Sequence, residues 1–262
     1  MKRVSLAIAL GIFVQCQVLA GPKCKAGMGY SAVDMSGPVN DSFLDNAKRI
    51  GISTIIRYYD WEDETLPNKT LKQSELKSIA ERGLNVAVVF QHHNDSTTTF
   101  ETVGRGKIDG KRSVYLAKSF SQPAGSAVYF GVDGIDAKFF EKFRKIKTTN
   151  EEKYGIDVVK RYFREVNSVF SGTGYKIGVY GSGLVCRSIL DAGLAQYCWL
   201  ANATGWPEYR EFEKSNRWQL KQLLPTKARD CFGVEVDLDV VGHHGQTFGQ
   251  WSPTRPREND SK

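Results

Sequence analysis

The sequence has no Cys-x-x-Cys pair, no long apolar run after its first twenty residues and no dense block of basic residues. The missing Cys-x-x-Cys spacing argues against a structural zinc site. A membrane-spanning helix needs about 18 consecutive apolar residues, and no such stretch occurs. Lysine and arginine are spread along the chain without a zinc-finger, RNA-recognition or helix-turn-helix pattern, which disfavours a nucleic-acid partner.

The first twenty residues have the pattern of a secretory signal peptide. Lys2 and Arg3 precede an apolar run over residues 4–14, and the small or compact residues at 18–20 suit a signal peptidase. We therefore expect residues 1–20 to be a signal peptide, cleaved after Ala20. The mature protein is then expected to be exported, periplasmic or secreted, and not stably inserted in a membrane.

Few cysteines are present, and export changes their interpretation. Removal of Cys16 with the leader leaves Cys24, Cys186, Cys198 and Cys231. In an oxidising compartment an even number of cysteines favours disulfides over free thiols, and four cysteines allow three pairings. The pairing that we favour joins Cys24 to Cys231, near the two ends of the domain, and Cys186 to Cys198.

The charge balance is basic. The formal net charge is +7, of which two charges belong to Lys2 and Arg3 in the predicted leader. A basic surface favours anionic partners such as cell-wall polymer or lipid head groups, although it carries no information about the fold.

Eight apolar segments recur along the chain, and most of them end on an acidic or polar residue. Segments of this kind are typical of buried strands that carry functional groups at their tips. They are GYSAVD ending at Asp34, TIIRYYD at Asp60, NVAVVFQ at Gln91, AVYFGVD at Asp133, KIGVYG from Lys176, YCWLA from Tyr197, RWQLKQ ending at Gln222 and VEVD at Asp237.

Segments with helical periodicity separate these strands. Apolar residues three and four apart predict helices over 42–50, 71–82, 111–120, 151–170 and 184–192. The region between Trp199 and Trp218 is less regular and predicts a loop with one short helix around 208–214. The alternation predicts parallel βαβ units, and hence an α/β fold: a (β/α)8 TIM-type barrel in a single domain over 21–249, with one degenerate outer helix. The polar tail 250–262 is expected to be disordered.

The same segments, in order, carry a family resemblance. GYSAVD, IIRYYD, LNVAVVFQ, VYFGVDGID, IGVYGSG, YCWLANATGW, WQLKQ and VEVDLDVV resemble the bacterial glycoside-hydrolase-like domain family, which is related to the muramidases of glycoside hydrolase family 25. The resemblance extends from about Gly29 to Val241. It implies a (β/α) barrel and, through the muramidases, cleavage of peptidoglycan glycan strands.

The resemblance also marks one departure. The muramidases carry two acids, two residues apart, on the fourth strand, so that both side chains point into the barrel mouth. Asp133 matches the first acid, whereas Ile135 occupies the second position. Asp136 is acidic but has the opposite parity, unless a bulge at Gly134 redirects it.

Four aspartates at strand tips are the candidate catalytic residues. Glycoside hydrolysis needs one protonated and one ionised carboxyl group, about 5 to 9.5 Å apart. Carboxylates crowded at one mouth repel each other, which raises the pKa of at least one and can supply the acid. The candidates are Asp133 and Asp34, followed by Asp60 and Asp237.

Six further residues are candidates for contacting a sugar. Aromatic rings stack on sugar faces, and amide side chains bind sugar hydroxyls without transferring protons. The candidates are Gln91, His92, Tyr59, Tyr180, Trp199 and Gln222. For Tyr59 and Trp199, packing within the barrel is an equally good interpretation.

Three functional hypotheses follow. The first is an exported glycosidase, acting on peptidoglycan with rim aspartates and needing neither cofactor nor metal. The second is a barrel that has lost an essential acid and binds cell-wall glycan or an envelope partner. The third, a metal-dependent hydrolase using His92 or His93, is disfavoured because the histidines are not spread over several strand tips.

Overall fold

The computed structural model describes residues 29–62, 67–134, 150–206, 208–223, 232, 234, 236–242 and 247–254, with side chains omitted for 150–154. The predicted signal peptide, the predicted Cys24–Cys231 disulfide, and residues 135 and 136 lie outside this part of the chain.

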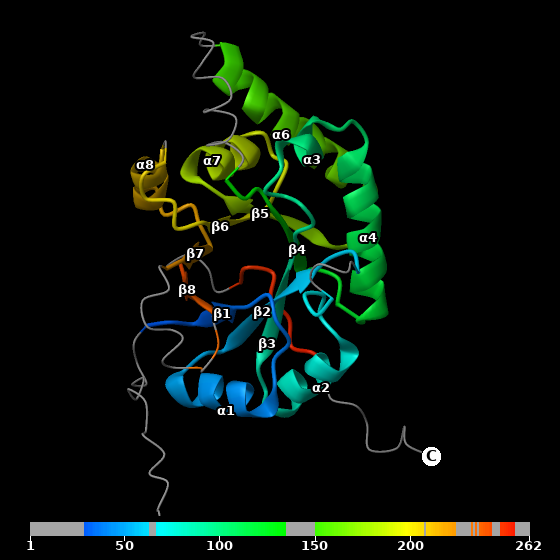
Figure 1. Ribbon diagram of the computed structural model, residues 1–262, viewed down its shortest axis with the longest axis vertical. Helices are drawn as coiled ribbons and strands as arrows, with labels where there is room; N and C mark the ends of the chain where they lie inside the picture. The colour runs from blue at the N-terminus through cyan, green and yellow to red at the C-terminus, as the bar shows by residue number, and fades with distance from the viewer. Residues whose placement is uncertain are drawn as a thin grey trace, which may run out of the picture.

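Eight strands form a closed barrel in which each strand pairs with its neighbours in sequence and β8 returns to β1 (Figure 1). This confirms the predicted α/β barrel. The strands are β1 (Ala32–Asp34), β2 (Thr54–Tyr59), β3 (Asn85–Phe90), β4 (Ala127–Gly131), β5 (Lys176–Gly181), β6 (Tyr197–Leu200), β7 (Leu220–Gln222) and β8 (Asp237–Val241).

Strand β8 departs from the predicted topology. Strands β1 to β7 are parallel, whereas β8 is antiparallel to both β1 and β7. The prediction that VEVD is a strand ending at Asp237 is therefore wrong, because Asp237 begins β8. Since the strand is reversed, its amino end lies at the same rim as the carboxyl ends of the other seven, and Asp237 still opposes Asp34 in the register.

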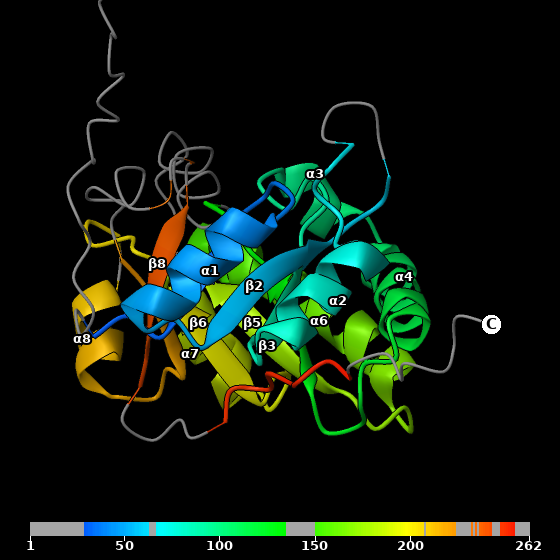
Figure 2. The same ribbon diagram turned by 90° about the horizontal axis from the view of Figure 1, so that it is seen from below.

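Helices cover the outside of the barrel (Figures 1 and 2). They are α1 (Asp41–Ile50), α2 (Gln73–Glu81), α3 (Thr97–Glu101), α4 (Arg105–Ser119), α6 (Asn150–Phe170), α7 (Gly183–Asp191) and α8 (Tyr209–Lys214). In α1 the Asn40 side chain accepts from the Phe43 N–H, and Gly51 ends the helix with a φ of 98°. All five predicted helices are present, and the six residues of α8 are the expected degenerate helix.

Helix α4 begins six residues before the predicted start at 111. The missed turns contain Gly106 and Gly110, which lower helix propensity. A Cβ at Gly106 would collide with the backbone of Tyr162 on α6. The glycines therefore let α4 pack closely on α6, and tertiary packing overrides local propensity.

Side chains alternate between two cores. Outward-facing residues such as Val33, Ile55 and Phe130 pack under the helices. A second, smaller cluster fills the inside of the barrel: Ala32, Ile56, Ala87, Val89, Ala127, Tyr129, Trp199, Leu220 and Phe248. This parity decides which rim side chains point into the barrel mouth.

The segment 247–254, drawn in red in Figure 2, runs across the end of the barrel at which β3 begins. Trp251 is 5% exposed and exchanges two backbone hydrogen bonds with Val86, with N···O distances of 2.8 and 2.9 Å. The domain thus includes Trp251, and the boundary predicted at residue 249 is too early. The rest of the predicted tail, 255–262, lies outside the described residues.

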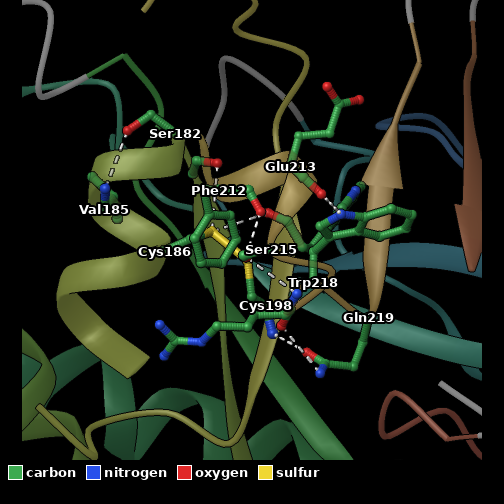
Figure 3. Close-up of a disulfide and its surroundings, with 12 residues drawn as sticks. Ser182, Val185, Cys186, Cys198, Phe212, Glu213, Ser215, Trp218 and Gln219 are labelled. Atoms are coloured by element: carbon green, nitrogen blue, oxygen red, sulfur yellow. Dashed lines mark hydrogen bonds between the residues drawn. A yellow bond between two sulfur atoms is a disulfide. The ribbon is translucent and has the colours of Figure 1, made fainter. Parts of the chain in front are cut away.

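One predicted disulfide is present. Cys186 on α7 is bonded to Cys198 on β6, with their Cα atoms 6.0 Å apart, and both residues are fully buried (Figure 3). The Cys198 N–H donates to the Gln219 side chain at 2.7 Å. The disulfide therefore ties helix α7 to strand β6, which also carries Trp199. Within the described ranges, no helix is long and apolar enough to cross a membrane.

Candidate active site

A polar pocket of about 120 Å³ opens at the rim formed by the strand tips. Its position follows from side-chain parity, because the inward-facing residue at each tip points into the barrel mouth. The lining residues come from seven of the eight strands or the positions just after them: Tyr58, Val89, Gln91, Asp133, Tyr180, Trp199, Gln222 and Asp237.

Three aspartates meet where β8 returns to β1. Asp34 lies at the end of β1, and Asp237 and Asp239 lie two residues apart on β8, so both face the same side. Asp34 is 3% exposed and Asp239 is fully buried. Burial, followed by the charge of Asp237, raises the pKa of Asp34 to about 7. Burial and the neighbouring Asp34 also raise the pKa of Asp239 well above its ordinary value.

Gln222 on β7 connects this cluster to the pocket. Its Oε1 accepts from the Tyr180 hydroxyl at 3.0 Å, which turns its Nε2 toward the acids. Nε2 donates to Asp237 Oδ2 at 2.9 Å and to Asp34 Oδ2 at 3.3 Å. The Tyr58 hydroxyl donates to the other oxygen of Asp34 at 3.1 Å. These bonds hold the carboxyl groups in fixed orientations.

Asp133 enters the pocket from the end of β4. Its Oδ2 accepts from Gln91 Nε2 at 3.1 Å, and its backbone N–H donates to the Asn94 carbonyl at 3.0 Å. Burial raises the pKa of the Tyr180 hydroxyl, and so do the nearby charges of Asp133, Asp34, Asp239 and Asp237. All four aspartates therefore lie close enough to Tyr180 to act on it electrostatically. Asp133 and the three-aspartate cluster therefore share one site.

Trp199 contacts the three-aspartate cluster from inside the barrel. Its indole N–H donates to Asp239 Oδ1 at 2.7 Å, and its ring packs edge-on against that of Tyr180, with centroids 4.6 Å apart. Trp199 is 1% exposed, so it combines the packing role and the rim role between which the sequence could not decide.

Asp60 and His92 do not line the pocket. Asp60 Oδ1 lies 2.8 Å from His92 Nδ1, and Oδ2 lies 3.2 Å from Lys69 Nζ. Lys69 also donates to the Gln91 carbonyl at 2.6 Å. The partners of Asp60 therefore belong to a separate buried network beside the site.

Tyr59, another predicted substrate contact, lies on the opposite face of β2. It is fully buried in the core beneath the helices, and its hydroxyl donates to Gln122 at 2.9 Å. Its neighbour Tyr58 has the inward parity and lines the pocket instead.

The structure adds Asp239, which the sequence reading missed. The signal was present, because Asp237 and Asp239 alternate with apolar residues in VDLDVV and so share a face. It was overlooked because the strand was expected to end at Asp237. Within the described ranges, no group of three or more His, Cys, Asp or Glu residues is arranged to hold a metal ion.

The closed eight-strand barrel, with helices on its outside, is the fold of an α/β-barrel protein. The family model for the Rv2525c-like, glycoside hydrolase-like domain matches residues 45–252. The chain belongs to this family.

Two curated proteins of Bacillus subtilis are similar to the chain in sequence. The chain is 27% identical to uncharacterized protein YbfG of Bacillus subtilis over 87% of its own length and 30% of that protein. It is 25% identical to uncharacterized protein FadG of the same organism, over 80% of its length and 34% of that protein. The chain thus spans about a third of these curated relatives.

A solved structure with a similar fold is that of the Mycobacterium tuberculosis Tat-secreted protein Rv2525c in complex with L-tartrate. The TM-score is 0.64 at 19% identity, with 85% of this chain and 99% of that chain covered. An uncharacterized B. stearothermophilus protein matches with a TM-score of 0.56 at 14% identity, over 81% of this chain and 96% of that one. These similarities show the fold.

Proposed function

We propose that the protein is an exported glycoside hydrolase that cleaves the glycan strands of peptidoglycan at this pocket. The observation that carries the proposal is the set of four carboxyl groups around Tyr180, two of which, Asp133 and Asp237, line the pocket. Glycoside hydrolysis requires a protonated and an ionised carboxyl group on either side of the scissile bond.

The raised pKa values supply the protonated group. With the pKa of Asp34 near 7 and that of Asp239 also raised, the three-aspartate cluster holds at least one proton at neutral pH. Asp237 is the member of this cluster that faces the pocket and shares the Gln222 amide with Asp34, so a proton that it takes up from Asp34 is passed on to the leaving oxygen. Asp133, held by Gln91, is the opposing base or nucleophile.

Export is part of the proposal. A buried disulfide between Cys186 and Cys198 is stable in oxidising compartments, where secreted proteins fold. The N-terminal pattern of residues 1–20 points the same way. An exported glycosidase meets peptidoglycan as the abundant glycan of the bacterial envelope.

A second candidate function is glycan binding without catalysis. It is favoured by the pocket volume of about 120 Å³, well below the roughly 300 to 1,000 Å³ of most small-molecule sites. The described walls thus enclose one chemical group or one edge of a sugar.

Zymography on purified peptidoglycan separates the two functions. Wild type, Asp133→Asn and Asp237→Asn are compared with Asp191→Asn, which changes an exposed aspartate paired with Arg217. A hydrolase clears the gel, and both pocket variants lose clearing by more than a hundredfold while the control does not. Clearing that survives both substitutions refutes the assigned roles. Retention on peptidoglycan without clearing supports the binding function.

A further inference from the structure

We propose that this pocket accepts a positively charged amino group, so that the substrate is a glycan containing glucosamine units with free amines. The inference rests on the proposed function for its glycan substrate and goes beyond it by naming the group that the pocket selects. A preference for a positively charged ligand contrasts with the basic net charge of the whole chain.

The charge of the pocket carries the first step. Its lining, as far as the structure describes it, contains two aspartates and no lysine, arginine or histidine. Behind the wall lie Asp34 and Asp239, which hold at least one proton near neutral pH, and an ammonium group bound in front of them favours their ionised form. A carboxylate or sulfate on the ligand would meet these charges at short range, whereas an ammonium group would neutralise them.

Two described cations near the pocket, Lys69 and Arg57, already have hydrogen-bonded partners. Lys69 Nζ bonds to Asp60 and to the Gln91 carbonyl. Arg57, with the outward parity on β2, donates from Nε to Glu75 at 2.7 Å. Neither residue is among the described residues that line the pocket.

The aromatic walls carry the second, independent step. Tyr58, Tyr180 and Trp199 line the pocket beside the two aspartates, and the face of an aromatic ring can bind an ammonium group.

Charge favours the free amine over its acetylated form. A pocket of about 120 Å³ has room for a compact ammonium group with the adjoining edge of a sugar. An N-acetyl group is bulkier, uncharged and a weaker partner for carboxylates. The same features therefore select for a de-N-acetylated unit.

Protonation gives a separate readout. A cation bound beside the cluster stabilises ionised carboxylates and lowers the pKa of Asp34 from about 7. Binding of the amine near neutral pH therefore releases protons from the protein, and the measured binding enthalpy depends on the ionisation enthalpy of the buffer.

Calorimetry with two trisaccharides tests the inference. The β-1,4-linked trimer of glucosamine and its fully N-acetylated counterpart are titrated into the full-length mature protein at about pH 6, where an amine is protonated. We expect the glucosamine trimer to bind at least tenfold more tightly. The preference should shrink in Asp237→Asn and persist in Asp191→Asn, with circular dichroism confirming that both variants are folded.

Equal affinity for the two trimers, or tighter binding of the acetylated one, overturns the inference. Activity distinguishes it from the proposed function. If peptidoglycan is cleaved as fast after chemical N-acetylation of its free amines as before, the hydrolase stands and the amine selectivity fails. If the glucosamine trimer binds preferentially but no glycan is cleaved, the selectivity stands and the hydrolase fails.

Discussion

Asp34 on β1 and Asp239 on β8 lie buried on adjacent strands, in electrostatic contact, at the seam where the strand direction reverses, and the charge of Asp34 raises the pKa of Asp239. Two carboxyl groups in such contact retain a proton between them, because burial and mutual repulsion disfavour the doubly ionised state. The seam of the barrel therefore places a proton reservoir directly behind the pocket.

The first prediction concerns stability against pH. The pKa of Asp34 rises from 3.8 to about 7 on folding, so the folded protein holds a proton that the unfolded chain has lost. This contribution is complete below about pH 4 and is lost as the pH rises through about 7, a change on the order of 3 to 4 kcal/mol. In Asp34→Asn, which mimics the protonated acid, this loss disappears.

Urea unfolding of both proteins between about pH 4 and 8 measures the effect. Asp34→Asn should gain stability relative to wild type as the pH rises. A constant difference across the range would mean that Asp34 has an ordinary pKa. Asp191→Asn is the control, since its carboxylate lies at the surface with Arg217.

The second prediction concerns the indole that supports the pair. Trp199→Phe removes the indole N–H that donates to Asp239 Oδ1 at 2.7 Å, and leaves a buried acid with one bond fewer. The free energy of unfolding should fall by about 1 to 3 kcal/mol from the hydrogen bond, in addition to any loss of packing. A double-mutant cycle with Asp239→Ala isolates the bond, and a coupling energy near zero would show that it contributes nothing.

The third prediction concerns the disulfide. Cys186 and Cys198 are 12 residues apart, and closing a loop of that length stabilises the fold by about 3 kcal/mol in the chain-entropy model. The double variant Cys186→Ser/Cys198→Ser should lose that stability in guanidinium unfolding. Because both cysteines are buried, wild type should resist mild reductant until it unfolds. Rapid loss of the bridge in the native state would contradict this.

The fourth prediction separates Asp60 from the pocket. Asp60→Asn leaves Lys69 buried without its carboxylate, which should cost about 3 to 5 kcal/mol of stability. The remaining folded protein should retain most of its glycan cleavage, because Asp60 does not line the pocket. A loss of cleavage as large as that of Asp133→Asn, at equal folded fraction, would show that Asp60 takes part in the reaction.

Much of this arrangement could be predicted from the sequence, because buried strands with polar tips produce a repeated pattern. The pattern located Asp34, Asp133, Gln91 and Gln222 at one rim, where the structure places them. It could not give the direction of β8, since VEVDLDVV alternates equally well in either direction. Only pairing with β1 and β7 determines it, and pairing is a property of the closed sheet.

The positions of two other predicted site residues, Tyr59 and Asp60, have a different physical origin. The sequence grouped Tyr59 with the sugar contacts, although alternation from Ile56 places Tyr58 on the inner face. Asp60 shares that parity but follows the last residue of β2, where strand geometry no longer fixes the side chain. Asp60 is paired with Lys69 and His92, which belong to other segments. No local sequence pattern predicts that these residues lie beside Asp60.

The most direct test of the account is a carboxyl-carbon NMR titration of the ¹³C-labelled protein. Asp34 is assigned by comparison with Asp34→Asn, and Asp239 by comparison with Asp239→Asn. We predict an aspartate signal that titrates near pH 7 in wild type and is absent or shifted in both variants, because the two acids are coupled. If every aspartate titrates near its ordinary value of about 4, no proton is held at the rim and the account is contradicted.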